Sequence, residues 1–206
     1  MKRYIKYWDK RVEAFGPILA FQPLTLNGPL KEDIIPLELG AMMIIRRKND
    51  RDILYFDPSK LDKTKYTRES ARRAFWYFFH ALLEDVEVQK RGIIILNYNA
   101  NYKNSNRDPP FTKMCFNTIK GALPLRMSAI HGTHVPYFYG CVITLVMIFL
   151  GERLRKRIIV HNGTNDEVNA ALESYGIRIQ DIPTDMGGLL KLDVRSWLQE
   201  RQNAGL

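Results

Sequence analysis

The sequence predicts a single α/β domain built on a mostly parallel β-sheet. Between residues 92 and 175, short apolar runs alternate with stretches whose apolar residues recur at helical spacing. Such alternation is typical of parallel strands joined by crossover helices. With 206 residues and 46% hydrophobic composition, the chain is long enough for one core and too short to need a second domain.

The first forty residues indicate one helix and an irregular segment. Apolar residues of the stretch Lys2–Phe15 share one helical stripe, and Gly16 with Pro17 is expected to end that helix. Prolines and glycines then recur up to Gly40, which predicts a segment that wraps the core rather than a separate domain.

A hairpin and an aromatic helix are expected next. The apolar runs 42–46 and 53–56 flank a polar turn, which predicts a β-hairpin. Residues 67–83 then place alanine, phenylalanine and leucine at helical spacing behind Thr67, a plausible N-cap.

The alternating part and the end of the chain complete the prediction. The expected elements are strand 92–97, helix 111–123, strand 127–133, helix 137–150, strand 157–161 and helix 167–175. Thr164 and Glu167 form a capping box for the last of these, and Gly176 suits the left-handed residue that ends it. A final amphipathic helix is expected over 194–201, with no readable docking surface.

The chain carries a formal charge of +9, so its surface attracts polyanions, whether nucleic acid or an anionic bilayer. Basic residues recur at 46–48 and at 60, 63, 65 and 68, but no stacking motif of exposed aromatic residues accompanies them. Nucleic-acid binding therefore stays the weaker alternative. Residues 1–11 are charged throughout and lack a secretory signal, so we expect a cytoplasmic protein.

The sequence lacks the devices of common α/β enzymes. There is no glycine-rich dinucleotide turn, no P-loop, no nucleophile elbow and no Cys/His cluster at zinc spacing, so we expect no enzyme, cofactor or metal. His131 and His134 are interpreted as polar residues at a strand-to-helix junction, and Asp181 and Asp185 as solvated loop charges. Cys115 and Cys141 are far apart in apolar surroundings and are expected to be reduced core thiols.

The segment 137–150 is apolar on almost every helical face, and it is too short to span a bilayer, which takes about 20 residues. It runs directly into the basic cluster 152–157. A central core helix followed by a solvated turn would explain both features. The neighbouring positions of an apolar element and a cationic cluster also suit docking on an anionic membrane.

Three motifs in order resemble the CRAL-TRIO lipid-binding domain. They are Pro124-Leu125-Arg126 followed by Ile130-His131, Pro136 and Phe138; Phe149-Leu150 followed by Lys156-Arg157-Ile158; and Ile182-Pro183 followed by Gly187-Gly188. The early strand from Ile53 to Asp62 and the central strand from Gly92 to Asn97 are similar to that family as well. The resemblance covers residues 40–191.

The resemblance implies a sheet that forms the floor of a hydrophobic pocket, closed by a gating helix at 137–150. It makes residues 1–39 a remnant of the helical module that usually precedes the domain, and residues 192–206 a C-terminal helix. Members that hold phosphatidylinositol carry a Glu where this chain has Leu125, and the Asp that commonly ends the central strand is Asn97. These departures indicate a different ligand.

We therefore expect a monomer that binds one lipid-like molecule and exchanges it at membrane surfaces, on which it is peripheral. A membrane-recruitment module without transfer remains an alternative. Arg157 and His161 are candidate head-group contacts, and Arg153, Arg155 and Lys156 are candidate membrane-facing cations. The residues expected to line the pocket are Leu96, Phe116, Ile119, Ile130, Val142, Leu145, Val146 and Phe149.

Overall fold

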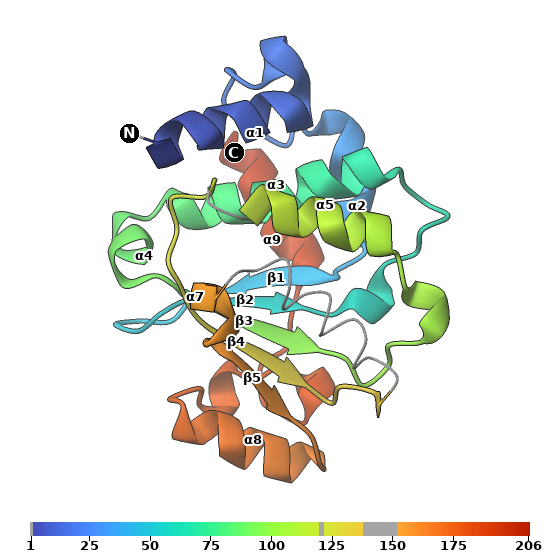
Figure 1. Cartoon of the computed structure of the whole chain (residues 1–206), viewed down its shortest axis with the longest axis vertical. Helices are drawn as coiled ribbons and strands as arrows, with labels where there is room; N and C mark the ends of the chain where they lie inside the picture. Colours follow the sequence, from blue (N-terminus) through green and yellow to red (C-terminus); the bar gives the residue numbers. More distant parts are fainter. Residues whose placement is uncertain (1, 120–121, 138–151) are drawn as a thin grey trace.

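The computed structural model describes residues 2–119, 122–137 and 152–206, which form an α/β fold around one sheet with helices on both of its faces (Figure 1). The strands lie in the order in which they occur along the chain; β1 pairs antiparallel with β2, and all other neighbours are parallel. The predicted mostly parallel sheet is confirmed. The strands are β1 (Met42–Ile45), β2 (Ile53–Phe56), β3 (Ile93–Tyr98), β4 (Met127–Thr133) and β5 (Ile158–His161).

Most predicted helices are present. In Figure 1, α1, α3 and α5 lie on one side of the sheet and α8 on the other. The helix predicted over 111–123 ends earlier, and the short polar helix α4 was not predicted; the helix expected over 137–150 lies outside the described residues except for its first residue. The described helices are α1 (Lys2–Leu19), α2 (Ile34–Glu38), α3 (Arg68–Leu83), α4 (Val86–Arg91), α5 (Pro109–Ile119), α7 (Glu152–Arg155), α8 (Asn165–Ser174) and α9 (Val194–Asn203).

Side-chain caps define where helices α3 and α8 begin. The Thr67 side chain accepts a hydrogen bond from the backbone N–H of Ser70 at the start of α3. Thr164 and Glu167 form the predicted capping box of α8, and Gly176 follows α8 with a φ of 79°. At Gly16, where α1 was expected to end, a φ of 76° kinks the chain, and helical structure continues to Leu19.

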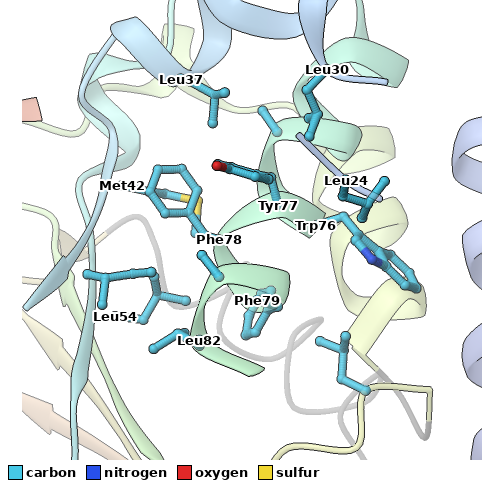
Figure 2. Packing of buried hydrophobic residues seen from close by; sticks show 14 of the residues in the cluster. Leu24, Leu30, Leu37, Met42, Leu54, Trp76, Tyr77, Phe78, Phe79 and Leu82 are labelled. Carbon is cyan, nitrogen blue, oxygen red and sulfur yellow. The ribbon is translucent and has the colours of Figure 1, made fainter. Parts of the chain in front are cut away.

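The larger core lies between the sheet and α3. Four consecutive residues of α3, Trp76 to Phe79, are buried because they reach neighbours on several sides of the helix (Figure 2). The last helix, α9, also packs on α3: the Trp197 ring stacks on Phe78 at a centroid distance of 5.2 Å. Arg201 Nε donates to the Tyr77 hydroxyl at 2.8 Å. This is the docking surface that the sequence did not reveal.

A second core covers the opposite face of the sheet. Leu96 and Tyr98 of β3 pack there with Val168 and Leu172 of α8. Asp181 belongs to this side, and its interpretation as a solvated charge is wrong: it is buried, and its Oδ2 accepts from Arg47 Nε at 3.1 Å. The pair joins the hairpin to the C-terminal loop, which a linear sequence cannot show.

No helix within the described ranges is long and apolar enough to cross a membrane.

Candidate functional site

A cavity of about 170 Å³ lies between the sheet and helices α3 and α5. On the same scale a water molecule needs about 10–15 Å³, so the space is far larger than a packing defect. All of the five strands contribute to its lining. The described lining residues are Met42, Leu54, Phe56, Pro58, Leu61, Phe75, Phe79, Ile95, Asn97, Asn99, Tyr102, Asn106, Asp108, Phe111, Thr112, Cys115, Phe116, Met127, Ile130, Gly132, Val135, Ile158 and Val160.

The floor of the cavity consists of two rows of side chains that cross the sheet. Strand register places Leu54, Ile95, Ile130 and Ile158 side by side in the first row. The second row lies two residues further along each strand, nearer the carboxyl ends of the parallel strands, and contains Phe56, Asn97, Gly132 and Val160. The first row is entirely aliphatic, whereas the second contains an amide and a glycine.

Burial along β3 shows that the described side chains do not fill the space over the cavity face of the sheet. Ile95 and Asn97 face the cavity and are only half-buried, whereas Leu96 and Tyr98 on the other face are buried. In a sheet with two packed faces, both sets of a central strand would be buried alike. The described side chains therefore leave an apolar surface uncovered next to the core.

The polar groups of the cavity gather beyond the carboxyl ends of β3 and β4. Asn97 and Asn99 come from β3 and the residue after it, and Asn106, Asp108 and Thr112 come from the loop before α5 and its first turn. The carboxyl end of parallel strands is the usual ligand edge of open α/β sheets. The cavity thus has an aliphatic interior and one polar end.

One thiol lines the cavity. Cys115 of α5 is buried, and burial raises the pKa of its thiol strongly. A thiol held in its protonated form is a poor nucleophile, so its surroundings suit an apolar wall rather than catalysis.

The predicted lining residues divide into three groups. Phe116 and Ile130 line the cavity. Leu96 does not, because it points to the opposite face of the sheet. The side chain of Ile119, the last residue of α5, lies outside the described part of the structure, as do Val142, Leu145, Val146 and Phe149.

The predicted head-group contacts lie away from the polar end. His161 of β5 is buried on the face opposite the cavity, where it meets His131. The Arg157 guanidinium donates to the backbone carbonyl of Met127 at the amino-terminal end of β4. Asn97 and Asn99 were not predicted to line the cavity. Side chains of a strand alternate between its two faces, so one residue of each neighbouring pair must face the cavity, as Ile130 does.

The histidine pair is a second feature that sequence reasoning did not find. His131 Nδ1 lies 2.9 Å from His161 Nε2, and the Tyr175 ring packs edge-on against both rings. Burial, with a smaller contribution from His161, lowers the pKa of His131 to about 4. The described residues contain no group of three or more His, Cys, Asp or Glu that could hold a metal ion.

Much of the positive charge is paired with carboxylates. Arg46 binds Asp52, Lys60 binds Asp185 and Arg68 binds Asp108, with nitrogen-to-oxygen distances of 2.6, 2.9 and 2.9 Å. These three are among the cations that could contact nucleic-acid phosphates, so their pairing weakens that alternative. In the basic cluster, Arg155 and Lys156 are exposed, and Lys156, which follows α7, binds Glu152 at the start of that helix at 2.9 Å.

Comparisons with known proteins agree with the sequence motifs. A family model described as the CRAL/TRIO domain matches residues 39–188. The chain is similar to clavesin-2 of Rattus norvegicus and of Homo sapiens, 25% identical over 201 residues that cover 96% of this chain and 58% of each relative. It is also similar to clavesin-1 of Rattus norvegicus, 24% identical over 151 residues that cover 71% of this chain and 41% of that protein.

The chain thus spans less than two thirds of the length of these curated relatives. Among solved structures, the crystal structure of Sfh5 aligns with a TM-score of 0.49 and 14% identity, over 65% of this chain and 56% of that one.

Proposed function

Because the chain belongs to the CRAL/TRIO domain family, whose domains generally bind hydrophobic ligands, we propose that it binds one lipid-like molecule and exchanges it at membrane surfaces. The ligand occupies the cavity between the sheet and helices α3 and α5. The observation that carries this proposal is the aliphatic row formed by Leu54, Ile95, Ile130 and Ile158, which the described side chains leave partly uncovered.

Burial of the ligand's chain supplies the binding energy. Each methylene moved from water into an apolar site contributes about 0.8 kcal/mol, so a chain of several methylenes outweighs the cost of ordering it. Phe75 and Phe79 of α3 form the wall opposite the sheet. Exchange needs no bond making or breaking, which agrees with a family of typically non-enzymatic binding proteins.

Access and membrane contact complete the proposal. The segment 137–150, which lies outside the described residues apart from Tyr137, is proposed as the gate from its sequence alone. Arg153, Arg155 and Lys156 follow it directly and are proposed to hold the protein at an anionic bilayer. Each basic residue near such a surface contributes about 1 kcal/mol.

Filling the cavity tests the proposal. Among the described residues, a Cβ added at Gly132 would meet Val135 Cγ2 at 3.5 Å, an ordinary contact, and Gly132→Val is expected to extend two methyl groups from the cavity floor into the cavity. Valine suits a β-strand, and the fold is expected to persist. Transfer of a fluorescent fatty-acyl lipid between vesicles should fall at least fivefold, with an unchanged circular dichroism spectrum.

The matched control is Ala170→Leu, which adds volume on an exposed position of α8, across the sheet from the cavity. Transfer by this variant should equal that of the unmodified protein. Undiminished transfer by folded Gly132→Val would contradict the cavity as the binding site. Vesicle binding without any transfer by the unmodified protein would favour the recruitment module instead.

A further inference from the structure

We propose that the ligand is a neutral lipid with a hydroxyl group, and that this hydroxyl hydrogen-bonds to the side-chain amide of Asn97 at the polar end of the cavity. The inference rests on the proposed function and specifies the chemical class of the ligand. It follows from three observations: an unpaired amide oxygen, neighbours whose donors are already used, and the absence of cations from the described lining.

The first observation is the state of Asn97. Its Oδ1 is buried and has no hydrogen-bond partner among the described residues, although Asn97 itself faces the cavity and is only half-buried. A buried acceptor that lacks a donor costs about 1–3 kcal/mol. A group inside the cavity that donates to this oxygen would remove that penalty.

The second observation is that nearby donors are committed to backbone carbonyls. Thr133 Oγ1 donates to the Asn97 carbonyl at 3.0 Å, and Asn99 Nδ2 donates to the Thr133 carbonyl at 3.1 Å. Thr112 Oγ1 donates to the Asp108 carbonyl at 3.0 Å. These three donors already satisfy backbone groups, and in the proposal the donor for Asn97 is supplied by the ligand.

The third observation is the charge of the lining. The described lining residues include no lysine, arginine or histidine. Their one carboxylate, Asp108, is already bound by Arg68 Nε, at 3.0 and 2.9 Å, and by the Phe111 N–H at 3.1 Å. A phosphate or carboxylate at this end would be desolvated beside Asp108, whose cation Arg68 is already paired, with no cation among the described lining residues to balance the added charge.

A hydroxyl group fits these requirements better than neutral groups that can only accept a hydrogen bond, such as a ketone, an ether or an ester. It can donate to the amide oxygen and can also accept from the amide nitrogen, so it satisfies Asn97 in either orientation of that amide. The aliphatic row, which contains Ile95 and Ile130, lies two residues nearer the amino-terminal ends of the strands than Asn97. The apolar part of the ligand is placed along that row, with its hydroxyl at the carboxyl edge.

Two series of lipids that share a chain and differ in the head test this proposal. One contains farnesol, farnesene and farnesyl phosphate; the other contains oleyl alcohol, octadecene and oleyl phosphate. Affinity is measured with the full chain by displacement of a fluorescent fatty-acyl probe. In at least one series the alcohol should bind about tenfold more tightly than both the hydrocarbon and the phosphate, as expected for a buried hydrogen bond.

Substitution of Asn97 gives the second arm. Asn97→Leu should reduce the affinity for the alcohol about tenfold and leave the affinity for the hydrocarbon unchanged or higher. If Asn97→Leu does not fold, Asn97→Val is tested in its place. The control Asn117→Leu makes the same chemical change at an exposed position of α5 and should alter neither affinity.

The outcomes separate the two proposals. Equal binding of alcohol, hydrocarbon and phosphate, or tighter binding of the phosphate, would overturn the hydroxyl assignment and leave a lipid-binding cavity. An alcohol preference that survives in Asn97→Leu would overturn the role of Asn97. If the probe itself does not bind and no member of either series does, both the assignment and the proposed function fail.

Discussion

His131 and His161 make the protein's stability depend on pH. Burial lowers the pKa of both imidazoles, that of His131 to about 4. The two rings extend from β4 and β5 and pack against the Tyr175 ring, away from water, where the neutral form is favoured. In the unfolded chain a histidine side chain binds its proton near pH 6.5. The folded state therefore binds fewer protons below that pH, and stability present above about pH 6.5 is lost as the pH falls towards 4.

Urea unfolding between pH 7.5 and 5 measures this effect. Each fully neutral buried histidine lowers the free energy of unfolding by up to about 1.4 kcal/mol per pH unit below pH 6. His131→Asn should make the slope shallower by about that amount, whatever its effect on stability at pH 7.5. An identical slope in His131→Asn and the unmodified protein would show that the folded and unfolded chains bind the His131 proton equally, which contradicts a lowered pKa in the folded state.

Arg46 and Arg47 are sequence neighbours with different structural roles. The Arg47 guanidinium is buried and binds Asp181 and Asp50, whereas the Arg46 side chain is 47% exposed and binds Asp52. Arg47→Met leaves the buried Asp181 with Arg178 as its remaining partner and should cost up to about 3 kcal/mol of unfolding free energy. Chemical denaturation measures the loss.

Arg46→Met is the matched control for this prediction. Arg46 is half exposed, and the buried Asp52 carboxylate keeps its hydrogen bond from the Arg47 backbone N–H at 2.9 Å, so this variant should lose less stability than Arg47→Met. Equal losses in the two variants would contradict the buried pair as the link between the hairpin and the C-terminal loop.

Lining residues could be predicted only where the sequence indicated which face of an element points towards the cavity. Ile130 and Phe116 follow from periodicity and motif position, and both line the cavity. Leu96 and Asn97 are adjacent in a run that is apolar up to Leu96, so nothing in its hydropathy tells which side chain faces the helices. Register with β2 and β4 decides it, and a shift of one residue exchanges the two faces.

At the scale of elements, α9 stabilises the fold by packing on α3. The half-buried Trp197 ring stacks on Phe78. The Arg201 guanidinium lies over the same ring, with its carbon 5.8 Å from the ring centroid. Trp197→Ala should lower the free energy of unfolding by about 2–3 kcal/mol, less than for a fully buried tryptophan. Thermal and urea unfolding measure the loss.

The exposed residue Arg195 on the same helix provides the comparison. Arg195→Ala removes no aromatic contact and should change stability by no more than about 0.5 kcal/mol. If both variants are equally stable, α9 does not depend on its aromatic contact with α3.

Predictability of the elements follows their signals. β3 and the hairpin strands contain uninterrupted apolar runs of four residues, and α3 and α8 have caps that the structure shows in place. The helix α4 spans six residues with charged and polar side chains at most positions, too short for a hydrophobic stripe. The partner of α9 depends on a contact between residues far apart in the chain, which periodicity does not contain.

At the scale of the whole molecule, the sheet separates two environments. One face is closed by α8 and the C-terminal loop into a fully packed core, and the other carries α3 and α5 with the cavity between them and the strands. The sequence motifs predict this fold class and the family, because they mark the strands and the turns that close them. The size and polarity of the cavity depend on side chains from all five strands and two helices, so they require the structure.

Comparison of the intact protein's mass under native and denaturing conditions, after purification from a eukaryotic host, tests the central claim most directly. The account predicts one added mass per chain in the native spectrum, lost on denaturation and extracted as a lipid, and absent from Gly132→Val. A folded protein that is empty as purified and stays empty after incubation with phospholipid, sterol and isoprenoid alcohol would contradict a ligand-binding cavity.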